Sequence, residues 1–167
     1  HATCLHRLTE HEVLEGVRFE DAIANGSYRV DVHHSQKPGL TFRYLDGSEV
    51  YVVPGQPRVE SRWRPARPID PTFYQIPYRS LVPRGCRNLL VACRAASFSS
   101  LAASSCRLSR TMMQLGQAAG TAVALAQELS VPLPQVPYAA LQDALRDQHV
   151  QLDWPMSDKM YAYLANE

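Results

Sequence analysis

The sequence predicts a mixed fold, α/β in class and α+β when the chain is taken by itself. Residues 40–53 (LTFRYLDGSEVYVV) alternate around an Asp-Gly dipeptide, which is typical of an antiparallel hairpin. Residues 89–92 (LLVA) are apolar without alternation, which is typical of a strand buried on both faces. Small and hydroxyl residues follow, and then a long helical segment that begins between residues 104 and 111 and ends near Leu129.

The remaining segments are assigned from periodicity and from turn residues. Residues 8–24 are predicted to be helical, because Thr9 and Glu12 form a capping-box pattern and Asn-Gly ends the segment. Residues 27–32 alternate like a strand, and residues 74–81 are expected to be extended. Pro77 argues against a central strand there.

Proline marks two further segments. Residues 53–71 are rich in Pro and Arg and lack periodicity, which predicts a loop or an extended connector. Residues 137–149 (PYAALQDALRDQH) predict a second, amphipathic helix that starts close to its proline.

Length and charge limit the classes of function. A chain of 167 residues fits one domain, or one domain with an appendage. The net charge of +1 gives no electrostatic argument for nucleic acid or for an anionic membrane surface. The densest basic group, residues 58–67, is interrupted by Glu60 and Pro65, so a solvated loop is expected.

The four cysteines show no CxxC pair and no zinc-site spacing with histidine. Buried free thiols are therefore expected, and nothing requires an oxidising compartment. No secretory signal is visible, so a cytoplasmic location is favoured. Because the chain begins at His1 rather than at Met, we expect it to be a piece of a longer protein or a processed product.

The apolar segment 111–126 is 16 residues long and contains two glutamines. Spanning a bilayer needs about 20 apolar residues, so we expect a buried helix and no membrane span. The GxxxG pattern of Gly116 and Gly120 then serves to let another backbone approach closely.

A strand followed by small residues and then a helix offers backbone N–H groups to an anion or to an electron-rich ring edge. Arg94 and Arg107 could add positive charge at the same helix end. Plain packing of a helix on a sheet is the alternative, since Ala and Gly are common wherever elements pack tightly. The sequence contains no GxxxxGK[ST], no GxSxG and no GxGxxG, so it carries no phosphate-binding loop for a dinucleotide.

His33 and His34 follow Asp31 at the end of a predicted strand. Adjacent strand residues point to opposite faces, which makes the pair poor co-ligands, and no metal site is predicted. A surface position is favoured for His34. His33 remains a candidate for the substrate side of a site.

Four motifs in order carry a resemblance to a known family. Residues 74–126 contain IPYRSL, NLLVA followed by Cys-Arg, SCRLSRT as an SxRxxxT pattern, and GQAAGTAVALA. This segment resembles the C-terminal part of the FAD-dependent oxidoreductase family, and residues 8–33 also look like that family. The likeness covers most of residues 8–152, and the combination is specific where each motif alone is weak.

The resemblance implies FAD as cofactor and a Rossmann-like flavin domain, to which residues 88–92 and the following helix would return. It implies that backbone amides near Thr111 and Met112 face the pyrimidine edge of the flavin. Two departures are Cys93, where the family usually has glycine, and Ser100, where it often has histidine. The implied cofactor-binding residues are Arg94, Arg107, Thr111, Met112, Gly116 and Gln117.

The implied reaction is hydride transfer between a small organic substrate and flavin. Arg107, Tyr78 and Arg79 are the candidate catalytic residues, and His33 is the candidate substrate residue. Packing and solvent roles explain Tyr78 and Arg79 equally well.

The resemblance divides the chain into a substrate-side α+β portion (1–81), a strand–helix of the flavin domain (82–130) and a helical tail (131–167). The N-terminal GxGxxG half of the family has no counterpart here, so we expect the chain to need that half or a partner chain. The alternative is a non-catalytic fragment or interaction domain that does not bind FAD alone.

Overall fold

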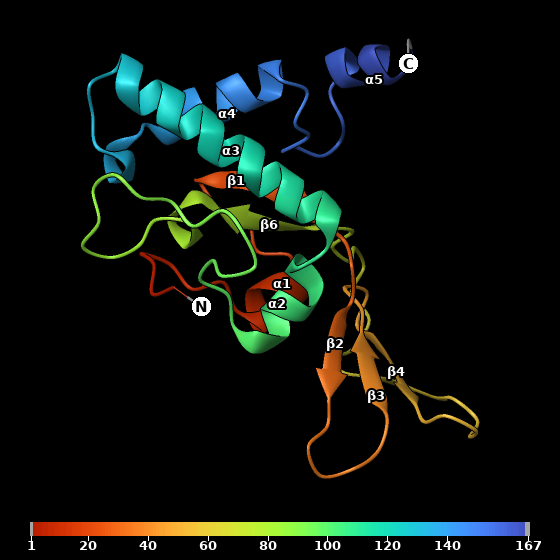
Figure 1. Ribbon diagram of the computed structural model, residues 1–167. Coiled ribbons are helices and arrows are strands. Elements are labelled where there is room, and N and C mark those ends of the chain that lie inside the picture. The colour runs from red at the N-terminus through yellow and green to blue at the C-terminus, as the bar shows by residue number, and fades with distance from the viewer. Residues whose placement is uncertain (1, 166–167) are drawn as a thin grey trace.

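A two-stranded antiparallel sheet lies at the centre of the body, with helices on both of its faces (Figure 1). The structure is a computed structural model and describes residues 2–165. α3 and α4 pack on β1 from one side, and α1 packs on β6 from the other.

The helices are α1 (Glu10–Glu15), α2 (Ser100–Cys106), α3 (Ser109–Glu128), α4 (Tyr138–Asp147) and α5 (Asp158–Leu164), with 3-10 turns η1 (Tyr78–Ser80) and η2 (Leu133–Gln135). The strands are β1 (Ala22–Gly26), β2 (Val30–His33), β3 (Leu40–Arg43), β4 (Ser48–Val52), β5 (Val59–Arg62) and β6 (Tyr74–Pro77).

The central sheet depends on a close approach between Gly26 of β1 and Tyr74 of β6, which are paired in register. A Cβ atom at Gly26 would lie 2.3 Å from the Tyr74 ring, so a side chain there would displace the ring. The buried Tyr74 hydroxyl lies 2.7 Å from Ser105 Oγ, and Ser105 Oγ donates to the Tyr28 carbonyl. Tyr74 therefore links the sheet to α2.

The prediction of a helix over residues 8–24 is confirmed only for Glu10–Glu15 and is wrong for the residues that follow. α1 has the predicted capping box between Thr9 and Glu12, but it ends at Gly16, which adopts the left-handed conformation with φ +62°. A Cβ atom at Gly16 would lie 2.4 Å from Pro71 Cβ, so the space there also requires glycine. The apolar residues that follow form β1, because pairing with β6 buries them.

A four-stranded antiparallel sheet, β2-β3-β4-β5, projects from the body (Figure 1). The predicted hairpin is confirmed as β3 and β4, and the strand expected at 27–32 is present as β2. Asp46 Oδ1 accepts hydrogen bonds from Ser48 N and Oγ, which lowers the pKa of Asp46, and Gly47 takes φ +83°. These contacts fix the turn.

Residues 53–71, expected to be a loop or an extended connector, contain a paired strand that the sequence did not reveal. Val59–Arg62 pairs with β4 as the outermost strand, and all four of its residues are exposed. A strand without a buried face shows no hydrophobic alternation, which explains why the sequence pattern did not reveal it.

The strand expected at residues 89–92 is absent, because no described strand lies beside this segment to complete a hydrogen-bonded ladder. Val91 N donates to the Leu81 carbonyl instead, at 2.8 Å, and Leu89 is half exposed.

The helical predictions in the second half of the chain are confirmed. α3 begins within the predicted window and ends one residue before Leu129, and α4 lies within residues 137–149. The sequence did not reveal α2, which Ser99 caps by accepting from Ala102 N, or α5. No helix in residues 2–165 is long and apolar enough to cross a membrane.

The fold is therefore mixed, with helices and antiparallel sheets, as the predicted class requires. One hydrophobic core contains residues from all three predicted portions of the chain, including Leu8, Phe98 and Leu141. The division at residues 81 and 130 stays a prediction.

A buried carboxylate joins the start of β1 to η1. The Asp21 side chain is fully buried, and its oxygens accept from Arg79 N, Nε and Nη2 at 2.9, 2.9 and 3.1 Å. The Asp21 carbonyl also accepts from Tyr78 N at 2.7 Å.

We expect Asp21→Asn to lower the free energy of unfolding by about 2–3 kcal/mol, because it leaves a bidentate guanidinium without its carboxylate; partial hydration of Arg79 keeps the loss near the low end for buried pairs. Urea unfolding measures the change. The control is Asp143→Asn, since Asp143 pairs with Arg146 at the surface and should change stability by less than about 0.5 kcal/mol. Equal losses in the two variants would contradict the assigned role of Asp21.

A second prediction concerns Cys106, whose pKa burial raises to about 12. The unfolded thiol titrates near pH 8.5, so above that pH the unfolded chain binds fewer protons than the folded one. The contribution of the buried, protonated Cys106 thiol to the free energy of unfolding is therefore fully present below that pH, and it is lost as the pH rises toward 12. Between pH 9 and 11 we expect the wild type to lose roughly 1 kcal/mol per pH unit more than Cys106→Ala. Denaturant unfolding at several pH values gives both slopes, and Cys93→Ala should keep the wild-type slope.

Candidate active site

Three of the predicted site residues lie around one cavity. His33 at the end of β2, Arg94 before α2 and Arg107 after α2 line a cavity of about 290 Å³. Small side chains of α2, Ala103 and Ser104, form part of its wall. The sequence places these residues in separate segments, and the packing of β2 on α2 brings them together.

A break between two helices positions the arginines. α2 ends when Arg107 N donates to the Ala103 carbonyl, and Leu108 then takes an extended conformation before α3 begins. Arg94 Nε donates to the Arg107 carbonyl at 3.1 Å, and Arg107 Nε donates to the Ser104 carbonyl at 3.3 Å. Both guanidinium groups are thus held by Nε and keep terminal N–H donors for an anion.

The Asp31 carboxylate lies near two arginines, one of which, Arg107, lines the cavity. Asp31 Oδ2 lies 3.7 Å from Arg107 Nη2, and Asp31 Oδ1 lies 3.5 Å from Arg29 Nε. The backbone N–H of Asp31 donates to Ser104 Oγ at 2.9 Å, which fixes β2 against α2. Arg94 and Arg107 thus line the cavity with no acidic side chain among the described lining residues, and this positive charge favours an anionic group.

The N-terminus of α3 lies next to this arrangement. Leu108, the residue before the helix, makes no side-chain capping bond, so the first backbone N–H groups of α3 lack an intrahelical acceptor. Met112 N donates to the Leu108 carbonyl at 3.0 Å and is not free. Thr111 is buried and lines a second cavity, of about 450 Å³, against β1.

The other predicted residues lie away from the cavity. Gly116 lies on the exposed face of α3 with open space where a Cβ would be, and Gln117 Nε2 donates to Gln148 Oε1 at 3.1 Å. Tyr78 is buried and its hydroxyl donates to the Leu133 carbonyl at 2.9 Å; burial raises its pKa. Arg79 is paired with the buried Asp21 carboxylate, and hydrogen bonding to it raises the pKa of Arg79.

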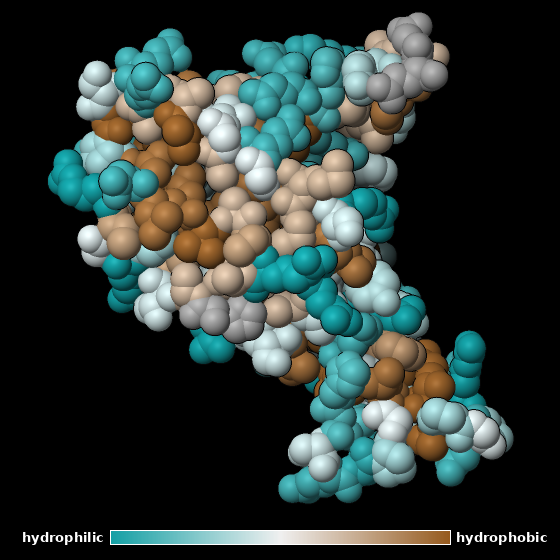
Figure 2. All heavy atoms as spheres, in the orientation of Figure 1, coloured by the Kyte–Doolittle hydropathy of each residue, from teal (hydrophilic) through white to brown (hydrophobic). Residues whose placement is uncertain are grey.

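The exposed face of α3 and the neighbouring segment 87–93 form an apolar surface (Figure 2). We call this the α3 face. No atom lies within 4 Å of the Cβ position at either glycine of the GxxxG pattern. Its large exposed side chains are Leu89, Met113 and Val123, of which Met113 is 73% exposed.

Sequence reasoning did not identify the ion pair between Arg29 and Asp31, which lies beside the site. The available signal was the spacing of Arg29 from Asp31, because residues two apart on a strand share a face. Among residues 2–165, no group of three or more His, Cys, Asp or Glu could hold a metal ion.

The cavity, its arginine donors and the open helix end define a site suited to an electron-rich or anionic ring edge. The sequence profile of the family described as FAD dependent oxidoreductase matches residues 1–145. The chain belongs to this family, whose cofactor is FAD, and a general flavin oxidoreductase function follows. Searches of curated proteins and of solved structures found no match.

The residues present fit FAD. The guanidinium groups of Arg94 and Arg107 keep free donors, and the uncapped start of α3 adds backbone N–H groups with a positive helix end. The small side chains of Ala103 and Ser104 belong to the lining of the same cavity.

We expect Asp31→Asn to lower the free energy of unfolding by about 1–2 kcal/mol, because the mostly buried Arg29 then keeps only its aromatic contacts, such as Phe42 at 4.0 Å. Thermal and urea unfolding measure the loss. The matched control is Glu60→Gln on exposed β5, which removes the same charge and should leave stability unchanged. An unchanged Asp31→Asn variant would show that the carboxylate does not hold the cations.

Proposed function

We propose that this chain supplies part of a flavin site that transfers a hydride between a small organic substrate and FAD. The observation that carries the proposal is that Arg94 and Arg107 line one cavity, and that Arg107 directly precedes the uncapped start of α3. Positive charge and fixed donors at such a site stabilise negative charge that develops on a ring.

FAD, when bound, supplies the centre that accepts or delivers the hydride. Arg107 and Arg94 would hold the electron-rich edge of the ring, with the backbone amide of Thr111 beside them. Arg107 is held through Nε, so its orientation does not depend on the ligand. The carboxylate of Asp31 limits its movement from the opposite side.

His33 is the proposed substrate residue. It lines the same cavity from the end of β2, and α2 supplies other lining residues. An imidazole nitrogen can act as a general base, which suits a substrate that loses a proton as it loses a hydride. Tyr78 and Arg79, the other catalytic candidates, have partners of their own outside this cavity, so the proposal gives them a supporting role.

The α3 face is the proposed contact for the dinucleotide-binding part of the flavin site. Gly116 and Gly120 lie open on it, which permits another backbone to approach the helix closely. Segment 87–93 beside it has backbone groups that a neighbouring strand could pair. A unit with a GxGxxG loop, on the same polypeptide or on a partner chain, would supply the phosphate contacts that this sequence lacks.

The same apolar surface supports a second candidate function, a non-catalytic interaction domain. An exposed apolar patch is typical of a protein interface, whether or not flavin is present. The two functions differ in one property: the second requires no FAD.

The test is to purify the full-length protein and to measure flavin released on denaturation and the dissociation constant for FAD. We expect stoichiometric FAD, and an affinity about 10-fold lower for Arg107→Gln because a charge-assisted hydrogen bond is lost. Arg107→Lys should lose less. Arg58→Gln, an exposed site on the projecting sheet's connector, is the charge-matched control and should bind as the wild type does.

Absence of flavin, with no binding of added FAD, would reject the proposed site and favour the interaction domain. FAD bound equally by all variants would reject the assigned role of Arg107. Anaerobic mixing with candidate substrates then follows the loss of oxidised-flavin absorbance. His33→Gln should slow that loss while leaving the FAD dissociation constant unchanged.

A further inference from the structure

A cavity outside the proposed flavin site lies where the N-terminal segment meets the chain between β6 and α2 (Figure 1). We call it the N-terminal cavity, and its volume of about 340 Å³ falls within the range of about 300–1,000 Å³ typical of small-molecule sites. Arg84 N donates to the Thr3 carbonyl at 3.0 Å, and Ala2 N donates to the Ala95 carbonyl at 2.7 Å. These backbone hydrogen bonds tie the segments around the cavity together.

Two arginines line the N-terminal cavity, and the described residues neutralise neither of them. Arg84 Nε donates to the Cys4 carbonyl at 3.1 Å, which fixes the side chain and leaves its terminal nitrogens as donors. Arg7 is exposed, and neither guanidinium forms an ion pair with a described residue. None of the described lining residues is acidic. The cavity therefore carries positive charge without a carboxylate partner, which favours an anion.

A buried hydroxyl group adds to these cations. Ser97 is 3% exposed and lines the N-terminal cavity. Its N–H donates to the Ser80 carbonyl at 3.0 Å and its carbonyl accepts from Leu8 N at 2.9 Å, so its backbone is fixed. Its Oγ makes no hydrogen bond with any residue between 2 and 165. A buried hydroxyl without a partner is costly, and an oxygen of an anion would accept a hydrogen bond from it.

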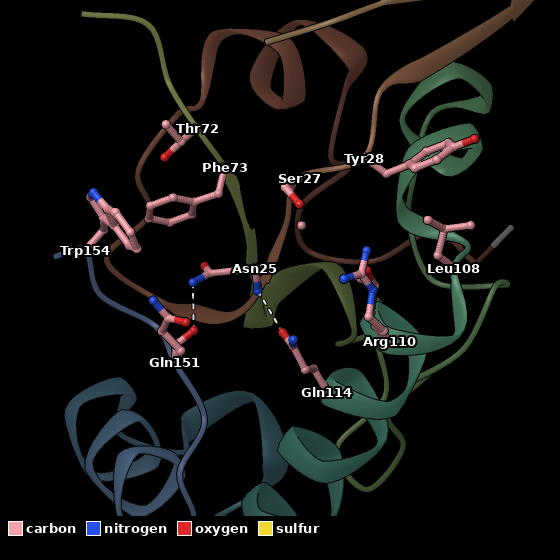
Figure 3. Close-up of a pocket in the computed structure, with 12 residues that line it drawn as sticks. Asn25, Ser27, Tyr28, Thr72, Phe73, Leu108, Arg110, Gln114, Gln151 and Trp154 are labelled. Carbon is pink, nitrogen blue, oxygen red and sulfur yellow. Dashed lines mark hydrogen bonds between the residues drawn. The ribbon is translucent and has the colours of Figure 1, made fainter. Parts of the chain in front are cut away.

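The amide groups that line the larger cavity beside α3, by contrast, already have protein partners. Figure 3 shows Asn25 N donating to Gln114 Oε1 at 2.9 Å and Asn25 Nδ2 donating to the Gln151 carbonyl at 2.7 Å. Arg110, which also lines that cavity, belongs to the start of α3 that the flavin proposal uses. The free donors outside the flavin site are therefore better developed at the N-terminal cavity.

The N-terminal cavity is also distinct from the cavity of Arg94 and Arg107, which we call the arginine cavity. Among the described lining residues the two cavities share only Phe98, whose side chain is fully buried. The two sites are therefore neighbours that have separate cations.

We propose that the N-terminal cavity binds the phosphate group of a small phosphorylated molecule other than FAD. The two guanidinium groups and the Ser97 hydroxyl are donors, and the oxygens of a phosphate are acceptors that arginine can bind in pairs. A phosphate monoester carries a charge of about −1.5 to −2 at pH 7, which matches two arginines better than the single charge of a carboxylate. The proposal goes beyond the flavin site and does not rest on it.

The probe is inorganic phosphate, titrated by isothermal calorimetry into the full-length protein in the presence of saturating FAD. We expect saturable binding with a dissociation constant below about 5 mM, since so small a ligand makes few contacts. Acetate carries one charge and fewer acceptor oxygens, and it should bind at least about 5-fold more weakly.

Arg7→Gln should weaken phosphate binding about 10-fold, because a charge-assisted hydrogen bond is lost. Arg7 is exposed and has no ion-pair partner among the described residues, so this variant should unfold at the wild-type temperature. Ser97→Ala should weaken phosphate binding about 3-fold through the loss of one hydroxyl donor. Arg58→Gln makes the same charge change as Arg7→Gln at an exposed site away from the cavity, and it should bind phosphate as the wild type does.

Two crossed measurements separate this site from the flavin site. Arg7→Gln should keep the wild-type dissociation constant for FAD, whereas Arg107→Gln should keep the wild-type dissociation constant for phosphate. A protein that binds phosphate in this pattern but binds no FAD would reject the flavin proposal alone.

Four results would overturn the phosphate proposal. They are no saturable binding of phosphate up to about 50 mM, equal losses in Arg7→Gln and Arg58→Gln, loss of phosphate binding in Arg107→Gln, or weaker FAD binding in Arg7→Gln. The last result would assign Arg7 to the diphosphate of FAD instead.

Discussion

The pairing of β1 with β6 is the constraint on which the rest of the structure depends. These two short strands, far apart in sequence, form the sheet on which α1, α3 and α4 pack. The pairing is possible because Gly26 leaves room for the Tyr74 ring, and Tyr74 in turn reaches Ser105 in α2. One missing side chain thus sets the distance between the sheet and the helix that carries the site.

The break between α2 and α3 produces the free backbone donors and places the arginines of the candidate site. A continuous helix would satisfy the N–H groups at residues 109–111 internally, whereas the extended Leu108 leaves them open. The same break lets the Arg107 carbonyl accept from Arg94, so the two cations are held by the helix end itself. The positive charge of the arginines and the free backbone donors of α3 therefore both originate at this break, beside the small lining residues of α2.

Local signals predicted the elements whose determinants are local. The Asp-Gly hairpin, the capping box of α1 and the proline-limited ends of α3 and α4 are formed by residues close in sequence. Predictions failed where a distant partner decides the conformation. Residues 22–24 were predicted as the end of a helix, whereas pairing with β6 makes them part of β1, and Val59–Arg62 has no buried face to reveal it.

The candidate site shows the same division. Arg94 and Arg107 could be chosen from motif spacing, but Arg29 and Asp31 acquire a role only when β2 packs on α2. Tyr78 and Arg79 belong to a motif that is equally strong in sequence, yet their contacts are internal to the body. Motif strength therefore does not separate residues that face a ligand from residues that hold the fold.

The projecting sheet has a consequence for how the protein can diversify. β2–β5 pair with one another rather than with the central strands, and the sheet joins the body through two chain segments. It supplies His33 to one wall of the arginine cavity, while the helices supply the other wall. Changes in the hairpin lengths or in the exposed strand can reshape the first wall without disturbing Arg94, Arg107 or the start of α3. The architecture thus allows ligand preference to evolve independently of the machinery beside it.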